Sequence, residues 1–171
     1  MTAVVIAIGT NLGDSASTVA DAVAALGALE GLLVTATSPV VSTAAVGGPE
    51  QPDYLNAVVL ARTTLAPPAL LAALHVIEAD HGRERLVRWG ARTLDLDLVA
   101  YGQPGDADEV VQDDAALTLP HPRAHERAFV LAPWAAADPG ARLRLPDGRV
   151  ADVRRLLDQA PDRAGVSMVP A

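Results

Sequence analysis

Apolar positions along the first hundred residues change their spacing several times. Short β-branched or alternating runs are typical of strands, and they occupy residues 4–8, 32–42, 54–63 and 94–101. Between these runs, apolar residues recur every three or four positions and predict two helices. The first helix follows Asp14 and Ser15, which can cap a helix N-terminus, and the second begins at Pro67, which the first turn of a helix accepts. The predicted order of elements is therefore β-α-β-β-α-β.

This order is typical of the ferredoxin-like α+β fold, in which an antiparallel sheet carries both helices on one face. The other face is then available for a site. Beyond residue 102 we expect an acidic loop over 103–114, a helix within 123–137 and a short terminal helix over 153–159. A chain of 171 residues, half of them apolar, predicts one domain, with a core over about 1–135 and a C-terminal extension over 136–171.

Composition narrows the classes of function. The chain has no cysteine, which excludes disulfides and thiolate metal sites. Its net charge of -8 argues against a general affinity for nucleic acid or for an anionic membrane. The N-terminus lacks the layout of a signal peptide, and no apolar run reaches the length of a membrane span. We therefore expect a cytoplasmic protein that binds small molecules, and neither nucleic acid nor a membrane. Its expected state is a monomer, which composition does not determine.

The basic residues are unevenly distributed. All 13 are arginines, and four of them, Arg83, Arg85, Arg88 and Arg92, fall within ten positions that contain one acid, Glu84. A guanidinium group pairs well with phosphate oxygens, so a cluster of this kind can neutralise a polyphosphate.

Directly after the arginines, aspartate alternates with leucine in the fourth predicted strand. Asp95 and Asp97 therefore leave the same face, about 7 Å apart, while the leucines take the opposite face. Two such charges repel by about 2 kcal/mol at an effective dielectric of 20, and a bound cation reverses that sign. The alternative is the solvated face of an ordinary amphipathic strand. The neighbouring arginines favour a site for a nucleotide and its metal ions.

The segment from Arg88 to Leu98 resembles the signature of the hydroxymethyldihydropterin pyrophosphokinases. Residues 8–14, 48–57 and 119–131 agree with the same family in order, so the resemblance extends from the first strand to about Pro133. It implies transfer of the pyrophosphoryl group of ATP to the hydroxyl of 6-hydroxymethyl-7,8-dihydropterin, which releases AMP in folate biosynthesis. Its ferredoxin-like core agrees with the order of elements derived from the pattern.

The resemblance also implies roles for individual residues. Two Mg²⁺ ions are held by Asp95 and Asp97, which with Arg83 and Arg92 form the catalytic group. The residues that match ATP contacts are Glu78, Arg83, Arg85, Arg88, Trp89, Arg92, Leu98, Thr118, His121 and Arg127. The residues that match the pterin pocket are Gly9, Thr43, Ala44, Val46, Tyr54, Asn56, Trp89, Asp95 and Phe129. Residues 82–91 are expected to close over the ligands, although Ala44 and Ala91 stand where the family often has proline.

Several alternatives stay open at this point. Three of the five aromatic residues, Tyr54, Trp89 and Phe129, lie in the motif stretches and could stack on a heterocycle, but Tyr54 and Phe129 could equally be core residues. His75, His81 and His125 are expected at the surface, with His75 able to edge the adenine site. A different nucleotide–metal transferase or a non-catalytic module of the same fold are the competing functions.

Overall fold

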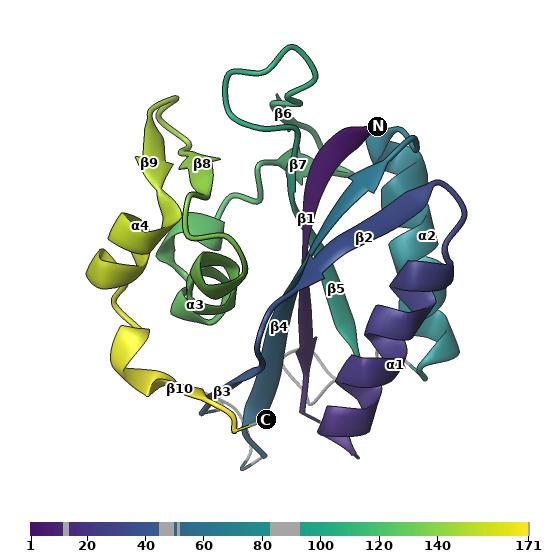
Figure 1. Cartoon of the computed structure of the whole chain (residues 1–171), viewed down its shortest axis with the longest axis vertical. Helices are drawn as coiled ribbons and strands as arrows, with labels where there is room; N and C mark the ends of the chain where they lie inside the picture. The colour runs from purple at the N-terminus through teal and green to yellow at the C-terminus, as the bar shows by residue number, and fades with distance from the viewer. Residues whose placement is uncertain (12–13, 45–49, 51, 83–92, 171) are drawn as a thin grey trace.

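The computed structural model of the chain describes residues 1–11, 14–44, 50, 52–82 and 93–170. Its centre is a six-stranded antiparallel sheet in which β5, β1 and β4 lie side by side (Figure 1). On the far edge of β4, β2 and β3 pair with opposite ends of that strand, and β10 pairs with β3. The strands are β1 (Thr2–Thr10), β2 (Leu32–Thr37), β3 (Val41–Thr43), β4 (Tyr54–Thr63), β5 (Asp95–Tyr101) and β10 (Val166–Met168).

Two helices cover one face of this sheet, α1 (Ser15–Ala28) and α2 (Pro67–Asp80) (Figure 1). The N-terminus of α1 is capped by Asp14, whose carboxylate accepts a hydrogen bond from Ser17 N at 3.1 Å. The apolar stripes of both helices pack on β1, β4 and β5 in one hydrophobic core. The predicted β-α-β-β-α-β order and the ferredoxin-like fold are therefore confirmed.

The second predicted strand is divided in two, because the ladder is interrupted at Ser38 and Pro39. Proline has no N–H to donate to a ladder. Ser38 bridges the gap: its N–H donates to the carbonyl of Val58 at 2.9 Å, and its hydroxyl accepts from Val58 N at 2.8 Å. The two short strands β2 and β3 thus follow one edge of β4 without a continuous ladder.

The opposite face of the sheet is only partly available, in contrast to the open face expected from the sequence. Helix α3 (Ala128–Ala137) packs against it, and α4 (Val153–Gln159) packs against α3 (Figure 1). Residues of α3 are apolar on every side, so this helix must be buried between two partners. They form a second core with Val58 of β4 and Val99 of β5.

The predicted helix within 123–137 is also divided. Arg127 has an extended backbone, with φ -107° and ψ 100°, and separates a short 3₁₀ turn from α3. The terminal helix α4 has the predicted bounds. The C-terminal extension further contains β10, which the sequence pattern did not indicate. The remaining short elements are β6 (Gln112–Asp113), β7 (Thr118–Leu119), the 3₁₀ turn η1 (Ala124–Glu126), β8 (Arg142–Arg144), β9 (Val150–Asp152) and the 3₁₀ turn η2 (Arg163–Gly165).

Candidate active site on the sheet face beneath α3

The register of the sheet places the predicted pterin and metal residues on one face. Gly9 of β1 lies opposite Asn56 of β4 on one side and opposite Asp95 of β5 on the other. Two residues earlier in β1, Ala7 lies opposite Val58 of β4 and Asp97 of β5 in the same way. Directly opposed residues of an antiparallel pair point to the same face. Asn56, Asp95 and Asp97 therefore project toward the side of the sheet that α3 covers.

The alternation of β5 divides its side chains as the sequence indicates. Leu94, Leu96 and Leu98 are at most 3% exposed and pack in the core with α1 and α2. Asp95 and Asp97 are half-buried on the other face. The leucines anchor β5 in the first core, and the carboxylates lie on the face of the sheet that α3 partly covers.

Glu78 connects α2 to this strand. It is only 2% exposed, and its Oε1 accepts a hydrogen bond from Leu96 N at 2.7 Å. In the described part of the chain β5 is the last strand on its side of the sheet, so this N–H donates to a side chain instead of to a further strand. The contact fixes the peptide between Asp95 and Asp97. The sequence resemblance indicated Glu78 as a nucleotide contact, and the structure adds this support of the carboxylate pair.

His121 and Arg127 face the carboxylates from the segment that follows β7. Burial lowers the pKa of His121 against the opposing influence of Asp97, so the imidazole is neutral at pH 7. Its Nδ1 accepts a hydrogen bond from Arg123 N at 3.2 Å, and the ring proton is therefore on Nε2. Burial also lowers the pKa of Arg127, with Asp97 again opposing the shift, but the guanidinium stays a cation. The site thus contains two anions, a cation and a neutral N–H donor.

The residues predicted to bind the pterin lie around Asn56. This side chain is 6% exposed, and its Nδ2 donates to Thr43 Oγ1 at 2.9 Å. A Cβ at position 9 would lie 3.2 Å from Asn56 Oδ1, so glycine leaves room for that amide. At the start of α3, the Phe129 ring has the guanidinium carbon of Arg127 5.7 Å from its centroid. Phe129 and Tyr54 are both half-buried, which suits a ring with one face available to a ligand.

A pocket of ≈ 340 Å³ opens beside the carboxylates at the edge of β5. Its walls come from α2, β5 and the chain from β6 to the residues after β7. The predicted residues Glu78, Asp95, Asp97, Leu98, Thr118 and His121 line it. The sequence did not indicate Leu71, Pro122 or the turn over 114–117, which line it as well. Leu71 has an apolar signal only, and the turn has the composition of an ordinary loop.

Other predicted residues are placed as follows. Thr118 Oγ1 donates to Asp113 Oδ1 at 2.9 Å, and Ala44 is exposed just after β3. His75 is exposed and lines the pocket, whereas the ring of His81 is bonded to the carbonyl of Ile77. Some predicted site residues lie outside the described part of the chain, namely Val46, Arg83, Arg85, Arg88, Trp89 and Arg92. The same holds for the predicted closing segment 82–91 from residue 83 onward.

The donor set suits a hard divalent cation. Within the described residues, no group of three or more His, Cys, Asp or Glu side chains is arranged to hold a metal ion. A pair of carboxylates is the usual protein contribution to a Mg²⁺ site in which substrate phosphates provide further ligands. Asp95 and Asp97 therefore fit a metal ion that binds together with a nucleotide.

Comparison with known proteins establishes the family. Residues 5–139 match the family model described as 7,8-dihydro-6-hydroxymethylpterin-pyrophosphokinase. The chain belongs to this family. A Mycobacterium leprae pyrophosphokinase, named for 2-amino-4-hydroxy-6-hydroxymethyldihydropteridine, is 45% identical over 175 aligned positions, covering 98% of this chain and 89% of the relative. The Haemophilus influenzae enzyme of the same name is 36% identical, covering 96% and 97%. The resemblance found in the sequence is confirmed.

Solved structures of pyrophosphokinases show the same fold at much lower identity. The wild-type HPPK-DHPS of Plasmodium falciparum, solved with pteroate, matches with a TM-score of 0.65 at 12% identity. The match covers 92% of this chain and 42% of that one.

In the described part of the present chain, no helix has both the length and the apolar character needed to cross a bilayer.

Proposed function

We propose that the face shared by β1, β4 and β5 performs the reaction of the pyrophosphokinase family, in which ATP donates its pyrophosphoryl group to 6-hydroxymethyl-7,8-dihydropterin. The pterin is held on the Asn56 side, where an amide can both donate and accept hydrogen bonds and Phe129 and Tyr54 can stack on a flat ring. ATP occupies the pocket at the edge of β5. Gly9 lies between these two parts of the site, because its partners on the neighbouring strands are Asn56 and Asp95.

Asp95 and Asp97 are the residues that would hold two Mg²⁺ ions. Bound there, the ions would neutralise the triphosphate and lower the pKa of the pterin hydroxyl. Glu78 keeps the carboxylates in place through Leu96. His121 Nε2 donates toward the phosphate oxygens, and Arg127 offsets their charge.

The chain itself mainly aligns and neutralises. The hydroxyl oxygen of the pterin forms a bond to the β-phosphorus of ATP, the bond from that phosphorus to the oxygen of the α-phosphate breaks, and AMP leaves with that oxygen. The hydroxyl proton passes to solvent. No protein nucleophile is needed for in-line displacement, and positioning with electrostatic stabilisation accounts for most of the rate in such reactions. Arg83 and Arg92 are further candidates for binding the phosphates.

The observation that carries the proposal is the register that sets Asn56 and Asp95 on either side of Gly9, because an amide that can bind the heterocycle then lies beside carboxylates that can hold the metal ions of ATP.

The test is incubation of the protein with ATP, Mg²⁺ and 6-hydroxymethyl-7,8-dihydropterin, followed by ³¹P NMR and chromatography. We expect AMP and the pterin diphosphate in equal amounts, and no turnover in excess EDTA. The matched control substrate is 6-methyl-7,8-dihydropterin, which lacks the hydroxyl and should give no AMP. ADP or inorganic pyrophosphate as product would indicate a different nucleotide–metal transferase, and no product would leave a non-catalytic module.

A further inference from the structure

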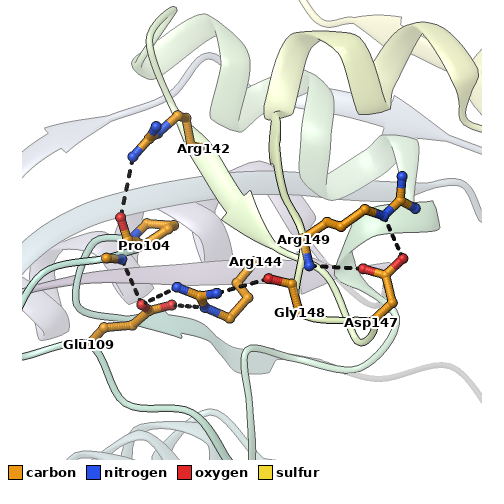
Figure 2. Close-up of polar contacts among 8 residues, drawn as sticks. Pro104, Glu109, Arg142, Arg144, Asp147, Gly148 and Arg149 are labelled. Atoms are coloured by element: carbon orange, nitrogen blue, oxygen red, sulfur yellow. Dashed lines mark hydrogen bonds and ion pairs between the residues drawn. The ribbon is translucent and has the colours of Figure 1, made fainter.

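The C-terminal extension is attached to the loop that leads into the ATP pocket. Figure 2 shows Arg144 of β8 meeting Glu109 through two parallel hydrogen bonds: Nε to Oε1 at 2.6 Å and Nη2 to Oε2 at 2.7 Å. The side chains are 9% exposed for Glu109 and 24% for Arg144, so water screens this pair less than a surface pair. Paired forks of this kind fix orientation as well as distance.

Glu109 is itself held firmly within its loop. Its Oε2 also accepts a hydrogen bond from Gly105 N at 2.7 Å. The next residue, Val110, donates its N–H to the carbonyl of Tyr101 at 2.8 Å. Gly102 has a φ of +82°, and a Cβ there would lie 2.4 Å from the Cα of Glu109. The backbone at Glu109 is therefore packed against the end of β5.

The chain that follows Glu109 forms one wall of the ATP pocket. The hairpin of β6 and β7 has two residue pairs, and its turn over 114–117 lines the pocket. Asp114 Oδ1 shapes the turn by accepting from Ala116 N and Leu117 N, both at 2.9 Å. A ladder this short cannot hold its own position in water. Its place depends on the segments that anchor its two ends.

Those anchors are known on both sides. At the end of β7, Leu119 is 1% exposed, and two residues further His121 N donates to the carbonyl of Val99 at 2.8 Å. Before β6, the anchor is Glu109 with Arg144. Strand β8 is in turn fixed to the second core by Leu143, which is 1% exposed.

From this geometry we infer that Arg144 is a positioning residue for nucleotide binding, which acts through Glu109 on the pocket wall over 114–118. The inference rests on the proposed function, because that function assigns the pocket to ATP. It gives the C-terminal extension a defined task in the reaction: the extension sets the affinity for ATP without touching it. The pterin side of the face is unaffected, because Asn56 lies on β4 and Thr43 on β3, and neither strand pairs with β6 or β7 in the described structure.

The variant to test is Arg144→Met, which keeps the length of the side chain and removes the paired donors. Loss of an anchor at a distance from the ligand should raise the KM for ATP by about 3- to 30-fold, with kcat and the KM for the pterin nearly unchanged. The dissociation constant of a non-hydrolysable ATP analogue, measured by calorimetry, should rise by the same factor. Arg144→Lys keeps the positive charge but cannot form the two parallel hydrogen bonds, so its KM for ATP should lie between those of the wild type and Arg144→Met.

The matched control is Arg149→Met, in the turn between β8 and β9. Arg149 pairs with Asp147 at 2.7 Å in an exposed contact within the turn, so the same charge is lost without affecting Glu109 (Figure 2). This variant should bind ATP as the wild type does. All assays are run well below the melting temperature of each variant.

Should Arg144→Met fail to fold, Glu109→Gln tests the same pair from its other partner and should raise the KM for ATP alone. An unchanged KM for ATP in a folded Arg144→Met or Glu109→Gln protein, or equal increases for ATP and pterin, would overturn the inference. A wild type that forms no AMP would instead refute the proposed function, so the two failures are distinguishable.

Discussion

At the scale of single residues, the site depends on carboxylates that are held apart from the core by one alternating strand. Asp95 and Asp97 share a face, and Glu78 bonds the peptide between them. A buried glutamate at this point fixes the strand without occupying the face that carries the two aspartates. Asp95 and Asp97 thus stay on the face that is proposed to bind the ligands.

Replacing Asp97 or Asp95 by alanine should lower kcat/KM by at least about 100-fold, since each change removes a group proposed to hold a metal ion against the transferring phosphate. The fold should persist, because both side chains are half-buried at the edge of the layer. Turnover at saturating Mg²⁺ and circular dichroism are the measurements. Asp21→Ala, at an exposed position of α1, is the matched control and should leave turnover intact.

The pair of Glu109 and Arg144 should make stability depend on pH. The hydrogen bond from Arg144 lowers the pKa of Glu109 below its ordinary value of 4.5. A carboxyl whose folded pKa is depressed stabilises the protein above its unfolded pKa and loses that contribution as pH falls through the folded value. Wild type should therefore exceed Glu109→Gln in urea midpoint at pH 7, and the difference should shrink below about pH 4.5. A difference that is constant from pH 7 to pH 3.5 would contradict this assignment.

At the scale of elements, α3 links the second core to the site, because Arg127 is its N-cap residue and Phe129 lies in its first turn. Arg127 at its N-cap provides no side-chain cap. Asp162, from the segment after α4, does so instead: its Oδ1 accepts from Ala128 N at 2.9 Å. One contact across the C-terminal extension therefore closes the helix end nearest the site.

Asp162→Ala should reduce the free energy of unfolding by about 1 kcal/mol, as the loss of a helix cap does. Urea denaturation is the measurement. Asp158→Ala is the control, because Asp158 forms an exposed pair with Arg163 and should change stability by less than about 0.5 kcal/mol. Equal decreases in the free energy of unfolding of the two variants would mean that the hydrogen bond from Ala128 N to Asp162 does not stabilise the helix end.

At the scale of the whole molecule, the described part of the chain is built on one six-stranded sheet with a hydrophobic core on each face. The helices α1 and α2 complete the first core, and α3 with α4 complete the second. The last strand, β10, pairs with β3 through three residues, and Val169 N donates to the carbonyl of Val40 at 3.0 Å. Strand β3 carries Thr43, the hydrogen-bond partner of Asn56.

Removal of residues 166–171 should destabilise the protein by about 1–3 kcal/mol, because several backbone hydrogen bonds to β3 are lost. The KM for the pterin should rise more than the KM for ATP, since Thr43 lies on the strand that loses its partner. Steady-state kinetics with each substrate varied in turn provide the measurement. A control that lacks only residues 170–171 keeps the ladder and should behave as the full chain does.

Much of the fold could be predicted because its signals are local. The alternation of leucine with aspartate in β5 determines which face each side chain takes, whatever the rest of the chain does. Asp14 caps α1 by contact with a residue three positions away. The bounds of β4 and α4 agree with the pattern for the same reason. The sequence pattern indicated the carboxylate pair and the arginine cluster, whereas the role of each site residue came from the resemblance to the family. Those roles stay predictions.

The sequence by itself thus determined the order of elements, the faces of β5 and the residue types available for phosphate and pterin. The tertiary structure alone decided that Gly9 lies between Asn56 and Asp95, that Glu78 supports Leu96, and that Arg144 fastens the loop before the pocket wall. These contacts join residues that are far apart along the chain. Their existence depends on register and packing, which no local period of apolar residues encodes.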